Sequence, residues 1–311
     1  MPSLMIDLRN EVKAFSPSLA AVQEFSRELG PDWLLIVVDT DAQRAETLAE
    51  ADFALVWTFA AAEYLQATHL RQLFTPAAGR DWIAPDPSGR ISTGHGSFHG
   101  AMIAQSLLAS LLAWTTELRT QQRLQSEKNW DRNAFPQRCL LRGRRALILG
   151  CGAIGDAIAS VLTPLGVVVT GLRRSQVGAQ EIRPGFILDS SSNLALHLAE
   201  TDILINLLPG IPENRHFVNQ EILAQLPAGA IYANFGRGTT QDESALLEAL
   251  DHGRLNLAIL DVTETEPLPQ ESPLWTHPKV QLSPHSSCCY GDYIPLFFAE
   301  VAGKLRQATK G

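Results

Sequence analysis

Three residues of complementary chemistry each follow a predicted strand in the second half of the chain. Arg237 comes after the apolar segment AIYANF, Glu266 after LAILD and His285 after VQLSP. In an open parallel sheet, ligands bind in the crevice outside the carboxyl ends of the strands, so residues far apart in sequence converge there. The pattern therefore predicts one site that contains a guanidinium, a carboxylate and an imidazole.

A glycine-rich turn precedes these residues in the segment ALILGCGAIGDAIASVL. A predicted strand leads into it and a helical pattern follows it. Gly150 allows the tight turn, Gly152 lets the backbone approach a pyrophosphate, and Gly155 permits close packing of the helix on the strand. Because the phosphates would then lie at the helix N-terminus, we assign this turn, with Ala153 and Ile154, to a dinucleotide cofactor.

The next predicted strand, VVVTGLRRS, lacks the acidic residue that would bind the adenosine ribose. Arg173 lies 18 positions after Gly155 and is followed by Arg174 and Ser175. Guanidinium groups bind phosphate through paired hydrogen bonds. The sequence therefore predicts NADP(H) as the preferred cofactor, with NAD(H) as the alternative.

The three strand-end residues suit the reduction of a small 2-keto acid. Arg237 would hold the substrate carboxylate and keto oxygen while negative charge develops on that oxygen. His285 would supply the proton. Glu266, hydrogen-bonded to the imidazole, would orient it and favour its charged form.

The elements that must position these residues form two alternating series. The first runs through SLMID, SLAAVQEFSREL, WLLIVVD, AQRAETLAE and FALVW, and then through two further strand patterns, RQLFTPAAG and RISTG. Such β-α-β alternation predicts a parallel sheet covered by helices. A long apolar helix is expected from about Phe98 to Leu118. The polar residues 118–145 are expected to form a connection without a core element.

The second series predicts a complete doubly wound sheet of seven strands. Its expected strands are Ala146–Gly150, Val167–Gly171, Phe186–Leu188, Asp202–Leu207, Ala230–Phe235, Leu257–Asp261 and Val280–Leu282. The final segment, GDYIPLFFAEVAGKLRQATK, has a helical pattern and is expected to pack back on the first lobe. The chain is thus predicted to be an α/β protein with two doubly wound parallel-sheet lobes.

Size and composition agree with two folded domains. A chain of 311 residues exceeds what one hydrophobic core usually supports. The formal charge is −8 and no Lys/Arg run occurs, so nucleic acid and anionic membranes are poor partner candidates.

The N-terminus does not resemble a secretory signal, so the cytoplasm is expected. Ile91 to Thr116 carries no charge, but its polar residues favour a buried helix over a membrane span.

The cysteines and histidines give no sign of a disulfide framework or a metal site. The four cysteines are few and irregularly spaced, and none forms a CxxC pair. His95 and His99 have a spacing that metal ligands on a helix can have, but no third ligand accompanies them. No metal is therefore expected, and His99 instead is considered as a residue that reaches the substrate cleft.

Together these motifs resemble those of the D-isomer-specific 2-hydroxyacid dehydrogenases, particularly the short glyoxylate and hydroxypyruvate reductases. PAAGRD is similar to the substrate-loop glycine motif, GHGSFHGAMIAQSLLASLL to the interdomain helix and GCGAIG to the cofactor turn. The catalytic Arg, Glu and His motifs of the family are similar, in order, to NFGRGTTQDESAL, LDVTETEPLP and SPHSS. The resemblance covers nearly the whole chain.

The resemblance implies a flavodoxin-like substrate lobe built from residues 1–97 and 290–311, with an inserted Rossmann NAD(P)-binding lobe at residues 98–289. It also implies a homodimer. Backbone N–H groups at Ala77, Ala78 and Gly79 are expected to hold the far side of the substrate carboxylate. Asp261 is expected near the nicotinamide carboxamide.

Four positions depart from the family pattern. Gln105 stands where the helix motif usually has Glu, and Gln241 replaces an apolar residue. Leu208 and Pro209 are assigned to cofactor binding, but their loop NLLPGIPEN has Gly-Ile in place of the usual Leu-Thr. None of these changes removes a catalytic group.

Two alternatives to NADPH-dependent reduction remain open. An NAD-dependent enzyme that oxidises a D-2-hydroxy acid would use the same residues. A non-catalytic dinucleotide-sensing protein would keep the cofactor turn, although the intact Arg, Glu and His set argues against it. Activity with small 2-keto acids, and the comparison of the two coenzymes, distinguish these functions.

Overall fold

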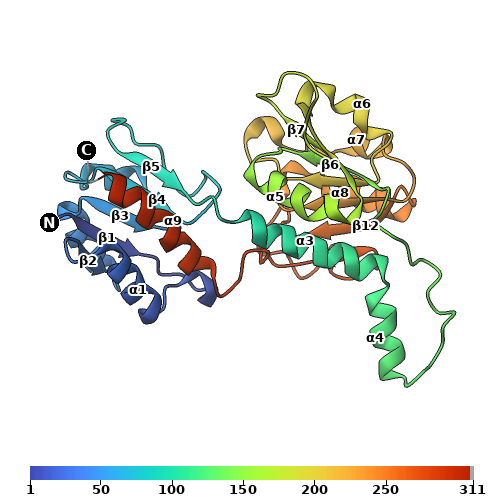
Figure 1. The fold of residues 1–311 in the computed structure, drawn as a ribbon, viewed down its shortest axis with the longest axis horizontal. Coiled ribbons are helices and arrows are strands. Elements are labelled where there is room, and N and C mark those ends of the chain that lie inside the picture. Colours follow the sequence, from blue (N-terminus) through green and yellow to red (C-terminus); the bar gives the residue numbers. More distant parts are fainter. Residues whose placement is uncertain (309–311) are drawn as a thin grey trace. The chain divides into compact units, whose positions relative to one another are not determined.

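The computed structural model describes residues 1–308 and divides into two compact units. The first unit contains residues 1–99 and the residues from Cys288 onward, and the second contains Gly100–Ser287 (Figure 1). The boundaries expected from the sequence were 97/98 and 289/290. Each unit is built around its own sheet, so each is described separately.

The first unit has a five-stranded parallel sheet in the order β2-β1-β3-β4-β5, which is the flavodoxin-like order. Its strands are β1 Ser3–Asp7, β2 Leu34–Val37, β3 Phe53–Val56, β4 Gln72–Thr75 and β5 Ser92–His95. Its helices are α1 Leu19–Leu29, α2 Asp41–Glu50 and α9 Tyr293–Ala308, with the short 3-10 turns η1 Lys13–Phe15 and η2 Ala61–Leu65.

Helix α9 joins the first unit although it comes from the other end of the chain (Figure 1). It packs on α1, where the rings of Phe25 and Phe298 stack with their centroids 4.3 Å apart. Helices α1 and α2 begin at capping residues: the side chain of Ser18 accepts the Ala21 N–H, and Thr40 accepts the Gln43 N–H. The packing of the final helix on the first lobe follows the sequence expectation.

The second unit has an eight-stranded sheet in the order β13-β12-β11-β10-β6-β7-β9-β8. Its strands are β6 Arg145–Leu149, β7 Val168–Arg173, β8 Gln180–Arg183, β9 Phe186–Ser190, β10 Ile203–Asn206, β11 Ala230–Asn234, β12 Leu255–Leu260 and β13 Val280–Leu282. The strand order reverses between β6 and β10, as in a Rossmann fold, and ligands bind at such a switch point. Two α/β lobes with parallel sheets confirm the predicted fold class.

Helices and short 3-10 turns connect the strands of the second unit. The helices are α3 Gly100–Thr115, α4 Leu118–Ser126, α5 Ala153–Leu162, α6 Leu194–Leu198, α7 Gln220–Ala224 and α8 Glu243–Asp251. The turns are η3 Thr163–Leu165, η4 Ser191–Asn193, η5 Pro212–Asn214, η6 Gly238–Thr240 and η7 Pro273–Trp275.

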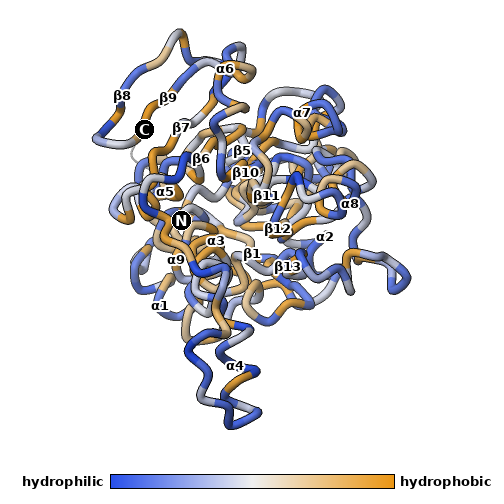
Figure 2. Tube along the Cα trace, turned by 90° about the vertical axis from the view of Figure 1, so that its right-hand side faces the viewer, coloured by the Kyte–Doolittle hydropathy of each residue, from blue (hydrophilic) through white to orange (hydrophobic). Residues whose placement is uncertain are grey.

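The core of the second unit lies where the central strands are covered on both faces. Tyr232, Leu204 and Leu260 are fully buried, and the hydrophobic residues of β10 and β12 are orange in Figure 2. Strands that are buried on both faces carry near-continuous apolar runs rather than alternation. This core makes the carboxyl ends of β10, β11 and β12 a rigid base for the loops that follow them.

Two expectations about the elements of this unit were wrong. Residues 118–145 include a helix, α4, whose one buried residue is Leu124. Most of its residues are polar and only one apolar side chain is buried, so the segment lacks the apolar stripe of a core helix, and α4 is largely blue in Figure 2. The sheet has eight strands instead of seven, because the short polar strand β8 pairs antiparallel with β9 at the edge. The long helix expected from about Phe98 to Leu118 is present as α3, Gly100–Thr115.

No single helix in residues 1–308 is long and apolar enough to cross a membrane. The pair α3 and α4 meets the length and composition criteria only when taken together, and it is bent by 62° at the break. Seven residues of α3 are buried, including Ile103, Leu107 and Leu111, so its apolar face packs within the protein.

Candidate active site

The carboxyl ends of β12 and β13 bring Glu266 and His285 together. Nδ1 of His285 lies 2.8 Å from Oε2 of Glu266. The other carboxylate oxygen, Oε1, accepts the backbone N–H of Thr263 at 3.1 Å. Both oxygens of Glu266 are therefore engaged, which fixes the carboxylate plane against the imidazole.

The pair shifts the titration of both groups. The hydrogen bond to Glu266 raises the pKa of His285 above its usual value and outweighs the opposing effect of burial. Burial would raise the pKa of Glu266, but the hydrogen bond and charge of His285, with a contribution from Arg237, lower it overall. A charged imidazole beside a carboxylate is the state that these shifts favour, as a proton donor requires.

Asp261, at the end of β12, holds the loop that carries His285. Its Oδ1 accepts hydrogen bonds from the Ser283 hydroxyl at 2.6 Å, the Ser286 N–H at 2.9 Å and the Ser287 N–H at 3.1 Å. Its backbone oxygen accepts the N–H of His285 at 2.8 Å. The loop therefore has a defined conformation, in which His285 adopts a positive φ of 48°.

Arg237 follows β11 and directly precedes the 3-10 turn η6. Its Nη1 donates to the carbonyl of Gly236 at 3.0 Å, and its charge contributes to the pKa of both Glu266 and His285. A Cβ at Gly210 would lie 3.0 Å from Cγ of Arg237. The unusual glycine in the loop after β10 therefore leaves room for the stem of this arginine.

A cavity of about 490 Å³ adjoins the pair within the second unit. Asp261, Glu266 and His285 line it together with apolar side chains, including those of Leu268 and Trp275. A concave apolar site with a few convergent polar groups is typical of small-molecule binding. Asp261, expected near the nicotinamide, thus lies in the lining and also supports the His285 loop.

The glycine turn between β6 and α5 has the geometry that a pyrophosphate needs. Gly150 adopts φ +79°, and a Cβ there would lie 3.0 Å from the carbonyl oxygen of Leu207. Nothing lies within 4 Å of the position of a Cβ on Gly152, whereas a Cβ on Gly155 would press on the buried thiol of Cys151. The helix N-terminus at Ala153 and Ile154 therefore has open space beside the backbone, so these residues fit a dinucleotide.

The loop after β7 carries cations where a carboxylate is usual. Arg173, Arg174 and Ser175 are exposed, and Nε of Arg173 donates to the carbonyl of Cys151 at 3.1 Å. This bond holds the Arg173 guanidinium close to the glycine turn. Burial raises the pKa of the Cys151 thiol to about 11, so this cysteine fills space beneath the turn.

Leu208 and Pro209 follow β10 on the opposite side of the switch point. The Leu208 N–H donates to Oδ1 of Asn206 at 3.1 Å, and the Pro209 carbonyl accepts from Nδ2 of Asn214 at 3.0 Å. These bonds fix the loop beside Gly150. The two residues thus lie next to the glycine turn.

The expected substrate loop, Ala77 to Gly79, belongs to the first unit and follows β4. Its start is fixed by two contacts: the Ala77 N–H donates to Oγ1 of Thr75 at 3.3 Å, and the Tyr293 hydroxyl donates to the carbonyl of Pro76 at 3.2 Å. Sequence patterns gave no signal that Tyr293 fixes the start of this loop, because the contact joins residues 217 positions apart.

His99 is a buried partner of Tyr293 within the first unit. It is 5 % exposed, and its Nε2 lies 3.0 Å from the Tyr293 hydroxyl. Burial lowers the pKa of His99 to about 4, so the ring is neutral near pH 7. Within residues 1–308 no three His, Cys, Asp or Glu side chains gather as a metal site would require.

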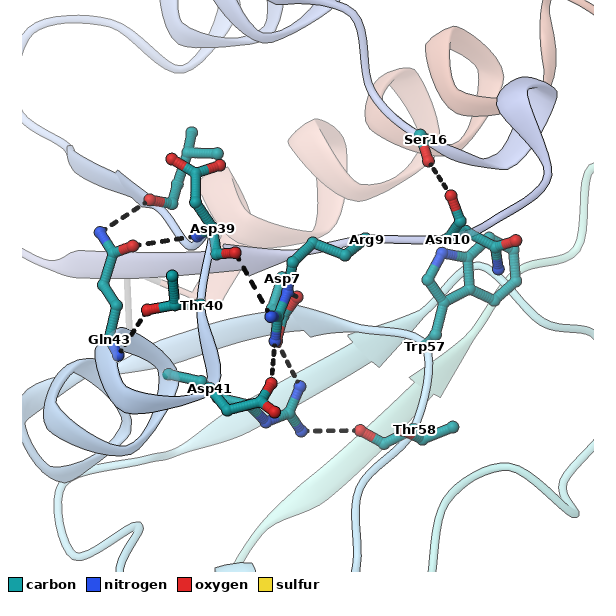
Figure 3. A network of polar contacts seen from close by, with 12 residues as sticks. Asp7, Arg9, Asn10, Ser16, Asp39, Thr40, Asp41, Gln43, Trp57 and Thr58 are labelled. Atoms are coloured by element: carbon teal, nitrogen blue, oxygen red, sulfur yellow. Dashed lines mark hydrogen bonds and ion pairs between the residues drawn. The ribbon is translucent and has the colours of Figure 1, made fainter.

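A second polar cluster lies at the carboxyl end of the first sheet (Figure 3), and its side chains line a cavity of about 470 Å³. The carboxylate of Asp7 accepts two hydrogen bonds from Arg9 and one from Arg44, at 2.7–2.8 Å. Asp41 pairs with Arg9, and Glu63 pairs with Arg44. Three carboxylates thus surround two guanidinium groups, so this cluster does not favour an anionic keto acid.

The comparisons with known proteins agree with the two lobes and the dinucleotide turn. Residues 108–287 match the family model described as D-isomer specific 2-hydroxyacid dehydrogenase, NAD binding domain. A protein of Klebsiella pneumoniae (strain 342) named glyoxylate/hydroxypyruvate reductase A is 34 % identical over an alignment of 250 residues that covers 76 % of each chain.

Two crystal structures share the fold over nearly the whole chain. A D-isomer specific 2-hydroxyacid dehydrogenase family protein from Aeromonas salmonicida subsp. salmonicida A449 is 26 % identical with a TM-score of 0.79, and the match covers 99 % of this chain and 96 % of that one. A family member from Xanthobacter autotrophicus Py2, solved with NADPH and MES, is 25 % identical with a TM-score of 0.78, covering 99 % and 95 %.

The Rossmann lobe, its glycine turn and these matches define an NAD(P)-dependent oxidoreductase that binds a nicotinamide dinucleotide and a small-molecule substrate. More specifically, the chain belongs to the D-isomer specific 2-hydroxyacid dehydrogenase family. The resemblance inferred from the motifs, and the enzyme class that it implied, are confirmed.

Proposed function

We propose that this enzyme reduces a small 2-keto acid, of the glyoxylate or hydroxypyruvate type, to the D-2-hydroxy acid with NADPH as the preferred coenzyme. The observation that carries the proposal is the Glu266–His285 pair, 2.8 Å apart at the strand ends of a dinucleotide-binding lobe. The name of the Klebsiella relative, glyoxylate/hydroxypyruvate reductase A, supports this substrate class.

Arg237, His285 and Glu266 have different roles in the proposed reaction. Arg237 binds the substrate carboxylate and stabilises the negative charge that develops on the keto oxygen. His285 delivers its Nε2 proton to that oxygen, and Glu266, on Nδ1, holds the ring and its charge. The reduced dinucleotide, when bound, supplies the hydride that C2 accepts. We assign the N–H groups of residues 77–79 to the far side of the substrate carboxylate.

The coenzyme preference rests on the loop after β7. Arg173 and Arg174 are exposed there, and no carboxylate occupies the ribose position to repel a 2′-phosphate. The Xanthobacter family member was solved with NADPH. We further propose that the chain is a homodimer, with the first unit as the substrate lobe.

A coenzyme and substrate panel tests the proposal. Purified enzyme is mixed with glyoxylate, hydroxypyruvate, pyruvate or a branched 2-keto acid, and kcat/KM is measured at 340 nm with NADPH and with NADH. We expect the highest values for glyoxylate or hydroxypyruvate with NADPH. Activity confined to NAD-dependent oxidation of a hydroxy acid would contradict the coenzyme assignment. Dinucleotide binding without turnover of any keto acid would indicate a sensing protein.

A further inference from the structure

Three loops of the candidate site meet at a cluster of His216, Glu243 and Glu264, to which no role has been assigned. The loops follow β10, β11 and β12, and these strands are adjacent in the sheet; Glu243 is the first residue of α8, directly after the second loop. The first loop also carries Leu208 and Pro209, the second Arg237 and the third Glu266. We call this cluster, defined by its three residues, the loop lock.

Glu243 and Glu264 bind each other's backbone reciprocally. The Glu243 N–H donates to Oε1 of Glu264 at 2.9 Å, and the Glu264 N–H donates to Oε1 of Glu243 at 2.7 Å. The residue pair therefore fixes both the separation and the register of the second and third loops. Burial raises the pKa of Glu243, as expected for a carboxyl enclosed by protein.

His216 adds the first loop to this arrangement. Its Nε2 lies 2.9 Å from Oε2 of Glu264, and its backbone N–H donates to the carbonyl of Thr239 at 2.9 Å. The residue adopts a positive φ of 49°, a conformation that non-glycine residues rarely take. A strained backbone held by two contacts indicates that the position of this imidazole is constrained.

The backbones of the second and third loops are in direct contact at Gly238. A Cβ on Gly238 would overlap the carbonyl group of Thr263. Arg237 is the residue before this contact, and the Thr263 N–H binds Oε1 of Glu266. Any change in the spacing of the two loops would therefore move the guanidinium relative to the Glu266 carboxylate.

We propose that His216, Glu243 and Glu264 are positioning residues, whose contacts hold Glu266 against His285 and set the place of Arg237 for keto-acid reduction. This inference rests on the proposed function for its catalytic consequence. Its structural content, the placement of Glu266 against His285, can be measured without substrate. The charged groups that influence the titration of His285 are Glu266, Asp261 and Arg237, so displacement of Glu266 changes that titration.

The test compares Glu264→Ala with Glu264→Gln. Alanine removes both acceptor oxygens, whereas glutamine retains one oxygen for the Glu243 N–H. Glu221→Ala is the matched control, because Glu221 is an exposed carboxylate on α7. His216→Asn provides an independent variant, since asparagine tolerates a positive φ but is too short to reach Glu264.

The first measurement is the NMR titration of the His285 imidazole in ligand-free protein, assigned by its absence from His285→Ala. We expect the midpoint to move to lower pH in Glu264→Ala and His216→Asn, to move less in Glu264→Gln, and to stay unchanged in Glu221→Ala. A wild-type midpoint in both Glu264→Ala and His216→Asn would overturn the proposal, whatever the activity of the enzyme.

The second measurement is kcat and KM for the preferred keto acid, with NADPH binding followed by fluorescence. We expect kcat to fall about tenfold to hundredfold in Glu264→Ala, because small misplacements of catalytic groups have effects of that size. The NADPH Kd should stay unchanged, and glutamine should restore part of kcat. Lower thermal stability with unchanged kcat and pH profile would show a merely structural role. If the wild type reduces no keto acid but the His285 titration still shifts in Glu264→Ala and His216→Asn, the proposed function is refuted and the loop lock remains supported.

Discussion

Replacing the carboxylate of Asp261 should release the loop that carries His285. Asp261 is 2 % exposed and Ser287 is 7 % exposed, so water screens their contact little. In Asp261→Ala, the N–H groups of Ser286 and Ser287 lose their acceptor, which lies at 2.9 and 3.1 Å in the wild type. The His285 N–H keeps its own acceptor, because that acceptor is the backbone oxygen of residue 261.

The size of the effect follows from the kind of bond that is lost. A hydrogen bond to a charged group contributes about 1.5–3 kcal/mol, and about 1.4 kcal/mol corresponds to a factor of ten. We therefore expect the Ser286 and Ser287 amides to exchange with solvent about tenfold to hundredfold faster in Asp261→Ala. Asp261→Asn retains one acceptor oxygen and should give a smaller increase.

Amide hydrogen exchange followed by NMR reports these rates residue by residue. The His285 amide is an internal comparator, and Asp86→Ala is the control variant, since Asp86 holds a different loop through the Ile91 N–H. Exchange of Ser286 and Ser287 within about twofold of wild type in Asp261→Ala would refute the reasoning, because it would mean less than the smallest expected loss.

Three further changes test other parts of the account. Glu266→Gln removes the charge that raises the pKa of His285. Because reduction needs the protonated ring, activity is lost as pH rises through that pKa, and in the variant this loss should begin at a lower pH than in the wild type. An unchanged pH profile of kcat would contradict the pairing. Arg173→Asp/Arg174→Ser should reduce the kcat/KM ratio of NADPH to NADH about tenfold to hundredfold, and a retained ratio would exclude these arginines. In Gly238→Ala the added Cβ forces the Thr263 backbone to move. We therefore expect the free energy of unfolding, measured by urea denaturation, to fall by about 1–3 kcal/mol and kcat to fall as well. Wild-type values would show that the loops after β11 and β12 separate easily.

Local patterns predicted the fold because they coincide with the strongest physical constraints. The buried central strands β10, β11 and β12 are apolar runs, and the turn from Gly150 to Gly155 combines a strand, a helix start and close backbone contacts. Parallel strands place their carboxyl ends at one edge. Residues that follow such strands, as Glu266 and His285 do, can therefore be assigned to one site from their positions in the sequence alone.

Other features had no local signal. Helix α4 is mostly polar and buries one leucine, Leu124, and the strand β8 is polar and lies at the sheet edge, so neither has the apolar residues that mark a core element. The bonds of Asp261 to the serines of the His285 loop, and those of His216 to Glu264, depend on side-chain directions across separate loops. Spacing along the chain does not carry that information.

The central claim is that His285 donates the proton in keto-acid reduction at a dinucleotide site that does not depend on it. Single-turnover stopped-flow with NADPH and hydroxypyruvate, comparing wild type with His285→Ala, tests this claim most directly. We expect the NADPH oxidation rate to fall at least about hundredfold in the variant, as general acid catalysis contributes factors of 10² to 10⁴, while the NADPH Kd stays unchanged. A variant that oxidises NADPH at the wild-type rate would contradict the account.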